Sequence, residues 1–246
     1  NYSMSFDGVD DYISLSPIDL SYSNQMTIMA WVNANDLTSE EDNTIIRQDW
    51  GEPNFMIAFD NNMNNANPPV FGFNVENTSG TNVSLEYPIS LQDFEGIWSH
   101  VCGVYDGSEM RIYIDGQFVY SAPHSGNIRS GGSNPNYLAI GSHPYPGYLN
   151  ETFDGLINDI SIWDIALDSI QIQDYMNCSP IGDESGLVGY WDFEDDSDIT
   201  TAIDVTGNGN DGIINGATYD TDVSPQSCQL TNVNGCDSTA ILNLTI

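Results

Sequence analysis

The stretch that decides the fold class is WSHVCGVYDGSEMRIYIDGQFVY, residues 98–120, near the middle of the 246-residue chain. A side-chain period of two runs through residues 101–105 and resumes through residues 110–114, which is the pattern of strands with one buried face. The DGSE between them predicts a turn, and the Asp115-Gly116 pair is typical of a two-residue hairpin. The stretch therefore predicts successive antiparallel strands joined by tight turns.

Similar strand patterns recur on both sides of this stretch. MTIMAWVNA alternates in the same way, and FMIAFD, VFGFNVEN, YLAIGS and DGLINDISIWD predict further strands. One short helix is expected where Asp168 precedes SIQIQDYMN, because Gln171 lies three residues later and completes a capping box. Ile170, Tyr175 and Met176 are expected on its buried side. Many short strands with one short helix predict an all-β fold, a two-sheet antiparallel β-sandwich or jelly roll.

The chain is predicted to form one main domain over residues 1–225. After Cys178, the segment SPIGDESG predicts a linker, and strands are expected in LVGYWDFED and GIINGATYD, with the turn-rich DVTGNGNDG between them. Residues 226–246 end in an alternating strand. This last part is expected to be a C-terminal strand extension or the start of a further repeat.

The charge of the chain is strongly one-sided, since 36 acidic residues face three arginines and no lysine, for a formal net charge of −33. Such a field repels nucleic acid and anionic membrane surfaces, and it destabilises the folded state unless cations screen it. It favours salty or calcium-rich surroundings, or calcium binding by the protein itself. No stretch approaches the roughly 20 apolar residues of a membrane span, so membrane insertion is not expected.

An ordered set of segments resembles the laminin-G-like, concanavalin A-like lectin and glucanase jelly-roll family. The segments are SFDGVDDYISL, MTIMAWV, WSHVCGVYDGSEMRIYIDGQFV, LAIGS and FDGLINDISIWDIALDSIQIQ, and the resemblance covers about residues 3–177. The resemblance implies a two-sheet sandwich that commonly carries one calcium ion near its rim. It also implies binding of glycans or other surface ligands, often as an appendage of a larger enzyme or adhesin, and hence a secreted, extracellular protein at the cell surface.

Residues 186–217 also look like part of this family's sequence, although they follow the FDG segment here instead of preceding it. We therefore expect residues 187–217 to fold back onto the same sandwich and to fill strand positions usually occupied from the N-terminus. The tail from Cys228 resembles repeats of large secreted bacterial surface proteins.

Two acidic segments form the expected calcium site. Calcium takes about six to eight oxygen ligands from carboxylates, amides, backbone carbonyls and water. One segment is the crowded DGVDD at the edge of the first strand, and the other is FDGLINDIS. The family commonly has an acid at the position of Asn158, so the amide lowers the charge of the site. The expected ligands are Asp7, Asp10, Asp11, Asp154, Asn158 and Asp159.

The loop DVTGNGNDG is a second candidate for calcium, through Asp204, Asn208, Asn210 and Asp211. Its spacing does not match the EF-hand loop. An Asn-Gly turn with positive-φ glycines accounts for the pattern better. Transition metals are not expected, because the three histidines are scattered along the sequence.

The four cysteines leave several pairings open. Cys102 lies in a strand-like segment, where a small buried side chain is the simplest expectation. An extracellular location would permit one disulfide among Cys178, Cys228 and Cys236. Cys178–Cys228 is favoured slightly over Cys228–Cys236.

Catalysis is not expected from this sequence. The related glycoside hydrolases carry alternating acids, Glu-x-Asp-x-Glu, on a central strand, and retaining hydrolysis needs two carboxyl groups about 5–5.5 Å apart. No such triplet occurs in the sequence, and GxSxG, P-loop and dinucleotide-binding motifs do not occur in their required context. A glycoside hydrolase therefore ranks third among the functions considered.

Carbohydrate recognition favours aromatic rings for the apolar faces of sugars, together with amides and carboxylates for their hydroxyl groups. Two loops carry this chemistry, RQDWGEPN and SHPYPGYLNE, and prolines stiffen the second. Packing of these aromatic rings beneath their own loops is the alternative. The candidate ligand-binding residues are Arg47, Asp49, Trp50, His143, Tyr145 and Tyr148.

The sequence thus predicts a non-catalytic, calcium-stabilised extracellular module for carbohydrate binding or surface adhesion, with a glycan or cell-surface ligand as its partner. The competing function is a structural repeat or spacer of a large adhesin or filament. In that case the terminal strand STAILNLTI pairs with neighbouring modules of the same protein. A glycan panel screened with and without a calcium chelator distinguishes the two functions.

Overall fold

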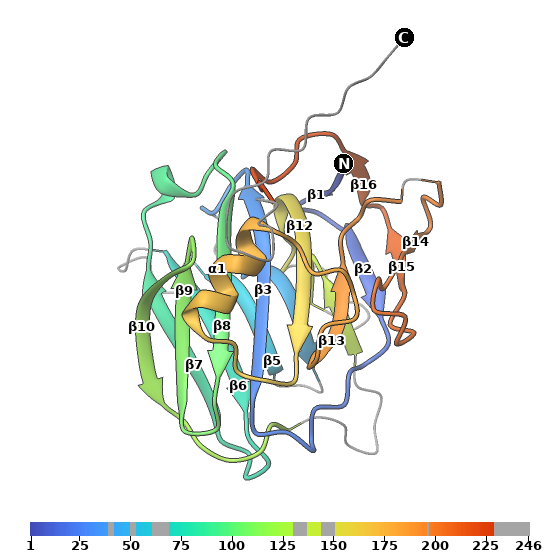
Figure 1. Cartoon of the computed structure of the whole chain (residues 1–246). Coiled ribbons are helices and arrows are strands. Elements are labelled where there is room, and N and C mark those ends of the chain that lie inside the picture. The colour runs from blue at the N-terminus through green and yellow to red at the C-terminus, as the bar shows by residue number, and fades with distance from the viewer. Residues whose placement is uncertain are drawn as a thin grey trace, which may run out of the picture.

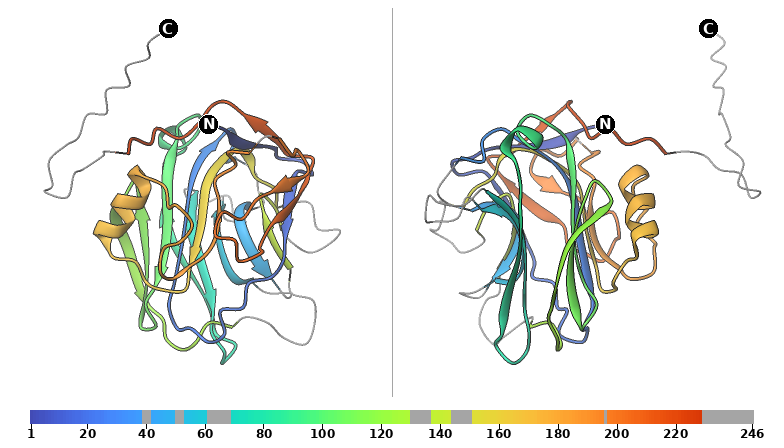
Figure 2. Two further views of the ribbon diagram at one scale, coloured as in Figure 1. Left: turned by 45° about the vertical axis from the view of Figure 1, so that its right-hand side comes forward. Right: turned by 90° about the vertical axis from the view of Figure 1, so that its left-hand side faces the viewer.

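Two antiparallel β-sheets pack face to face in the computed structural model of the chain, and Figure 2 shows them nearly edge-on in its right-hand view. The structure describes residues 1–38, 42–49, 53–60, 69–129, 137–143, 151–195 and 197–228. Within these residues each sheet has eight strands. The predicted all-β sandwich is therefore confirmed.

The first sheet, sheet A, is centred on β3 and β12 (Figure 1). The first half of β12 pairs with β1, and its second half pairs with β13 along the same edge. In order, the strands are β10 (Gln117–Pro123), β9 (Glu109–Ile114), β8 (Ser99–Tyr105), β3 (Met26–Ala34), β12 (Asp154–Trp163), β1 (Ser3–Asp7) and β16 (Thr218–Asp220), with β13 (Leu187–Trp191) on β12.

The second sheet, sheet B, carries β4 and β5 near its middle. Its strands in order are β14 (Thr201–Ala202), β15 (Gly212–Asn215), β2 (Tyr12–Leu15), β11 (Tyr137–Ile140), β4 (Asn43–Asp49), β5 (Pro53–Asp60), β6 (Val70–Glu76) and β7 (Asn82–Pro88). A single turn of 3₁₀ helix, η1 (Leu91–Asp93), precedes the return to sheet A.

The predicted hairpins of residues 98–120 are confirmed as β8, β9 and β10, which pair in succession. Asp115 and Gly116 form the tight turn, with φ values of 48° and 69°, as a type I′ turn requires. Gly103 of β8 faces the core, where an added Cβ would lie 2.4 Å from the ring of Phe73. The glycine thus lets the ring of one sheet approach the backbone of the other.

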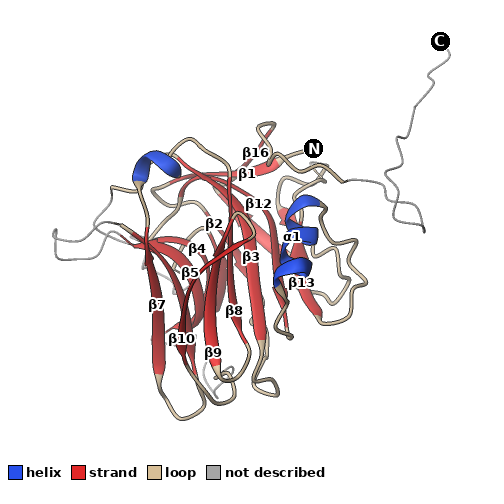
Figure 3. Cartoon of the chain, turned by 60° about the vertical axis from the view of Figure 1, so that its left-hand side comes forward, coloured by secondary structure: helices blue, strands red, loops and turns tan. Residues whose placement is uncertain are grey.

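The main core fills the space between the sheets with apolar side chains from both, including Phe6, Phe73 and Ile160. A second, smaller apolar cluster, which includes Met29, Cys102 and Ile172, joins the outer face of sheet A to the helix α1 (Ser169–Asn177). Figure 3 shows α1 lying against this sheet. Sheet A is therefore covered on both faces where α1 packs on it.

The start of α1 is as predicted, because the Asp168 carboxylate accepts the Gln171 backbone N–H and the Gln171 side chain accepts the Asp168 N–H. The buried side of the helix differs from the prediction. Ile172 is fully buried, whereas Ile170 is 68% exposed. Tyr175 packs on Trp163, with ring centroids 4.7 Å apart. Among the described residues, no helix is long and apolar enough to cross a membrane.

Residues 187–217 contribute strands to both sheets. β13 pairs with β12 in sheet A, and β15 pairs with both β2 and β14 in sheet B. Beyond them, Cys228 is bonded to Cys178 just after α1, which confirms the favoured disulfide. Cys102 is a buried free thiol, as expected. The expected terminal strand, residues 239–246, lies outside the described residues.

Candidate functional site

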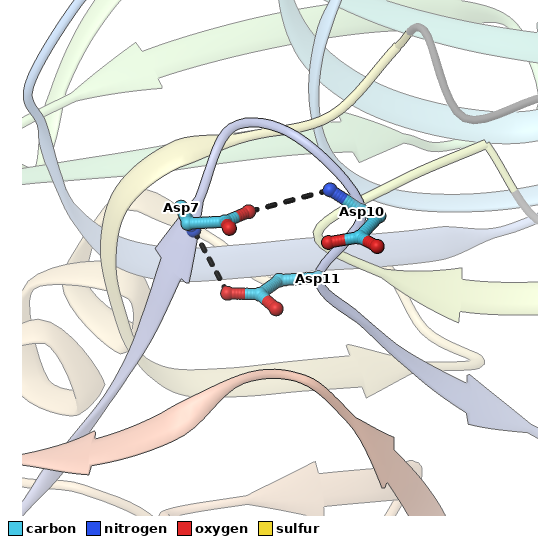
Figure 4. A group of neighbouring side chains, drawn as sticks. All are labelled: Asp7, Asp10 and Asp11. Carbon is cyan, nitrogen blue, oxygen red and sulfur yellow. Dashed lines mark hydrogen bonds between the residues drawn. The ribbon is translucent and has the colours of Figure 1, made fainter.

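Three aspartates gather in the short connection that carries the chain from β1 in sheet A to β2 in sheet B. We call Asp7, Asp10 and Asp11 the acidic corner (Figure 4). One carboxylate oxygen of each lies within 4.8 Å of those of the other two. Among the described residues, this is the group of acidic, histidine or cysteine side chains that is spaced to share a metal ion.

Local hydrogen bonds hold the acidic corner in shape. The Asp7 carboxylate accepts the backbone N–H groups of Val9 at 2.9 Å and Asp10 at 3.3 Å, and the Asp11 carboxylate accepts the Asp7 N–H at 2.9 Å. Asp and Asn favour such turns because their short side chains reach the backbone two residues on. Gly8 makes the bend at φ +71°, and a Cβ there would lie 2.7 Å from Asp154 Cβ.

Asp11 is the least exposed of the three, at 9%. Burial raises the pKa of its carboxyl group, and the neighbouring charges of Asp7 and Asp10 raise it further against a hydrogen bond that lowers it. A bound cation would relieve both effects. All donors at the corner are oxygens, which is the ligand type that calcium prefers, so the residues present fit this ion.

Asp154 also lies beside the acidic corner, because it is the register partner of Asp7 across β1 and β12. Its carboxylate accepts a hydrogen bond from the Asn35 amide at 2.9 Å. The Thr152 hydroxyl donates to the backbone carbonyl of Gly8 at 2.7 Å, which ties the start of β12 to the same turn. Four of the six expected ligands are thus neighbours.

Asn158 and Asp159 are not brought to the acidic corner. They lie four and five residues beyond Asp154 on β12, and a strand advances about 3.3 Å per residue, so the separation along the strand is roughly 13 Å or more. Asn158 donates to Ser224, and Asp159 accepts from Ser179 and Tyr190. The expected single set of six ligands therefore divides into two places.

The second candidate loop, residues 204–211, is held by its own hydrogen bonds. Asp204 is 3% exposed, and its carboxylate accepts from the backbone of Tyr190, the hydroxyl of Thr206 and the amide of Asn210. Gly207 and the second glycine of the loop have φ values of +70° and +87°. The turn interpretation accounts for these contacts without an ion.

The two aromatic loops lie largely outside the described residues, and this includes Trp50, Tyr145 and Tyr148. Arg47 is buried on β4, where its guanidinium forms an ion pair with Glu151. Asp49 ends β4, and His143 follows β11 and is partly exposed. Because β4 and β11 are antiparallel with Ile46 opposite Ile140, Asp49 and His143 lie toward opposite ends of this strand pair.

A pocket of about 460 Å³ lies where Asn158 and Asp159 are found, and we call it the polar pocket. It is bounded by β12, β13, the segment after α1 and residues 223–228. Burial raises the pKa of Asp159 to about 6, against hydrogen bonds from Tyr190 and Ser179 that lower it. The predicted calcium site groups its two β12 residues with Asp7, whereas the structure places them in this pocket. The adjacent polar pair Asn158-Asp159 within an otherwise apolar strand was the available signal.

Comparison with family models gives a match over residues 7–173 to the model described as the concanavalin A-like lectin/glucanases superfamily. This segment begins at the acidic corner and ends within α1. A comparison with curated protein sequences found no match.

Several solved structures share the fold. A candidate carbohydrate binding protein from Bacteroides ovatus has 19% identity and a TM-score of 0.72, over 92% of this chain and 61% of that one. A heptameric SAP-like pentraxin from Limulus polyphemus has 17% identity and a TM-score of 0.60, over 89% and 94%. The binding domain of Paraclostridial Mosquitocidal Protein 1 has 12% identity and a TM-score of 0.50, over 72% and 47%. The chain thus spans less than two thirds of the Bacteroides ovatus protein.

Proposed function

Because the chain belongs to the concanavalin A-like lectin/glucanase superfamily, we propose that it is a non-catalytic, calcium-stabilised extracellular module that binds carbohydrate or a related surface ligand. The Bacteroides ovatus protein of the same fold is itself a candidate carbohydrate binding protein, which supports this ligand class. The disulfide between Cys178 and Cys228 supports an extracellular location, since such bonds persist in oxidising surroundings.

The placement of acids supports the non-catalytic part of the proposal. Retaining glycoside hydrolysis needs a pair of carboxyl groups about 5–5.5 Å apart that flank a bound sugar. Among the described residues, three carboxylates within 4.8 Å of one another occur at the acidic corner, at the edge where the chain changes sheets. Those of Asp7 and Asp11 are already engaged in holding the turn.

The calcium part of the proposal rests on the acidic corner, and this is the observation that carries it. Three carboxylates and the adjacent Asp154 concentrate negative charge at one turn of a chain that is already highly acidic. An ion that binds only the folded state raises its stability. Calcium would then join the connection between the sheets to the start of β12.

The calcium test is thermal unfolding of the whole chain at fixed ionic strength, with calcium chloride or with a chelator. Asp10→Asn is the informative variant, because Asp10 is exposed and its carboxylate has no role in the turn hydrogen bonds described above. We expect calcium to raise the melting temperature of the wild type and to have little effect on Asp10→Asn. Asp93→Asn, an exposed acid on η1, is the matched control and should keep the calcium response. Identical thermal unfolding curves of the wild type in calcium chloride and in chelator would contradict calcium binding.

The carbohydrate test is a glycan array probed with the wild type, Trp50→Ala and Tyr145→Ala in calcium-containing buffer. Loss of one aromatic platform should weaken sugar binding by about tenfold or more, since an aromatic contact of about 1–2 kcal/mol is removed. Tyr120→Ala is the control, because Tyr120 is 47% exposed on β10, at the edge of sheet A, whereas β4, which leads into the Trp50 loop, belongs to sheet B. Absence of saturable binding to any glycan would contradict the carbohydrate proposal and leave the calcium result unaffected.

A further inference from the structure

A β-bulge in β12 turns two consecutive polar side chains to the same face of sheet A. Asn158 pairs with Trp31 and Ser161 pairs with Met29, so three steps along β12 match two along β3. Asp159 has φ +50°, a left-handed conformation that Asp adopts more readily than most residues. Ile160 returns to the core between the sheets. A bulge of this kind re-aims side chains and is enriched at binding sites.

Both side chains line the polar pocket, and one of them has an unmet hydrogen-bonding need. Asn158 is 3% exposed, and its amide nitrogen donates to the Ser224 hydroxyl at 3.2 Å. Its carbonyl oxygen Oδ1 is fully buried and accepts no hydrogen bond from the protein. Leaving a buried acceptor without a donor costs about 1–3 kcal/mol. A hydrogen-bond donor on a ligand would therefore satisfy Asn158 Oδ1.

The polar pocket is also rich in negative charge. Asp159, Asp192 and Glu194 all line it, and none of the described side chains in its lining is cationic. The α-amino group of Asn1, at the exposed rim, lies 3.6 Å from Glu194. Burial raises the pKa of Asp192 as well as that of Asp159, so the pocket holds its carboxylates at a cost that a positive ligand would reduce.

The volume of the pocket and the spacing of its carboxylates favour a small molecule over a single metal ion as its ligand. Among the described residues, the carboxylates of the pocket do not lie together within 4.8 Å, as those of the acidic corner do. A volume of about 460 Å³ falls in the range of small-ligand sites. Hydroxyl groups of Ser179 and Ser224 and the amide of Gln226 complete a lining that suits a polar molecule.

We propose that the polar pocket binds a small polar molecule that carries a protonated primary amine and hydroxyl groups, such as an amino sugar or an amino alcohol. The ammonium group, with three donors, bonds to Asn158 Oδ1 and to the Asp159 carboxylate. Asp192 and Glu194 supply the surrounding negative field. The described residues that line this site include none of Arg47, Asp49 and His143 from the two aromatic loops, so the proposal stands whether or not those loops bind glycans.

The experiment is calorimetric titration of the whole chain with glucosamine and ethanolamine, beside glucose and N-acetylglucosamine, which lack a positive amine. We expect saturable binding of the two amines and none of the neutral sugars. Asp159→Asn should weaken amine binding by about tenfold or more, as expected for a lost hydrogen bond to a charged group. Asn tolerates the left-handed backbone, so this variant keeps the bulge. Asp93→Asn removes an equal charge from an exposed site and should bind as the wild type does.

Asn158→Leu gives an independent readout, because it removes the acceptor at similar volume, and it too should weaken the amines. Circular dichroism of each variant establishes that it is folded. Three outcomes would overturn the proposal. The first is no binding of either amine at millimolar concentration, and the second is equal binding of the neutral sugars. The third is displacement of the amines by calcium, together with amine binding by Asn158→Leu that equals that of the wild type. None of these depends on the result for Trp50 or Tyr145, so failure here differs from failure of the proposed carbohydrate function.

Discussion

Asp159 shows how one backbone conformation determines the chemistry of a side chain. The bulge in β12 places its carboxylate on the outer face of sheet A, where burial dominates and raises its pKa to about 6. In the unfolded chain the ordinary value, 3.8, applies. Between these two values the folded state holds a proton that the unfolded state has lost, so this residue's contribution to stability falls as the pH rises.

We therefore predict that Asp159→Asn is more stable than the wild type above pH 6, by up to about 2–3 kcal/mol, since a shift of one pKa unit equals about 1.4 kcal/mol. The gain should shrink as the pH falls below 6 and vanish near the unfolded-state value. Urea unfolding at a series of pH values measures it, with Asp93→Asn as the control for lost charge. A constant difference between wild type and Asp159→Asn across this range would show that the carboxyl is not desolvated.

Gly216 determines how closely the chain after β15 approaches the acidic corner. It has φ +81°, and a Cβ there would lie 2.0 Å from Asp11 Oδ1. Gly207 has a similar φ of +70° but no atom within 4 Å of such a Cβ. Alanine substitutions at these two glycines would share the cost of backbone strain, and only the one at Gly216 would add a clash with Asp11.

Gly216→Ala is predicted to lower the free energy of unfolding more than Gly207→Ala does. Strain of a non-glycine residue in this region costs about 1–3 kcal/mol, and the clash adds to it. Chemical denaturation of both variants gives the comparison, and the excess for Gly216→Ala should fall in an Asp11→Ala background. Equal losses for both glycines would mean that Asp11 does not lie against this turn.

The helix α1 has one feature that the sequence predicts, its start, and one that the sequence does not predict, its buried face. Its start follows from Asp168 and Gln171, which are local signals. Its buried face does not follow, since Ile170 and Ile172 are equally apolar, and contact with sheet A decides between them. For the same reason the corner of Asp7–Asp11 was predictable from neighbouring residues, whereas the bulge that separates Asn158 and Asp159 from it depends on the register between β12 and β3.

The two isoleucines of α1 give a direct test of this packing. Ile172→Ala should destabilise the fold by about 2–5 kcal/mol, because it leaves a cavity against sheet A. Ile170→Ala should change stability by about 0.5 kcal/mol or less, as surface substitutions usually do. Thermal unfolding of the two variants measures the contrast, and a reversed order would place the other face of α1 on the sheet.

At the scale of the whole molecule, the fold accommodates a charge that works against it. All three arginines are already in ion pairs, Arg47 with Glu151, Arg111 with Asp106 and Glu109, and Arg129 with Glu76. The 36 acidic residues therefore far outnumber the three arginines that could neutralise them. Their mutual repulsion is a long-range effect, and a monovalent salt reduces it through screening.

We predict that sodium chloride, raised from about 0.01 M to 0.5 M, increases the melting temperature, because screening shortens the Debye length from about 30 Å to below 8 Å. The wild type and Asp10→Asn should respond alike to sodium, since one charge among so many changes the total field little. Calcium at constant ionic strength should then raise the melting temperature of the wild type alone, because only the binding of an ion depends on the geometry of the acidic corner. Differential scanning calorimetry in both salt series separates the two effects. A melting temperature that is independent of sodium would show that the acidic surface is not what limits stability, and an equal calcium effect in both proteins would assign calcium to general screening.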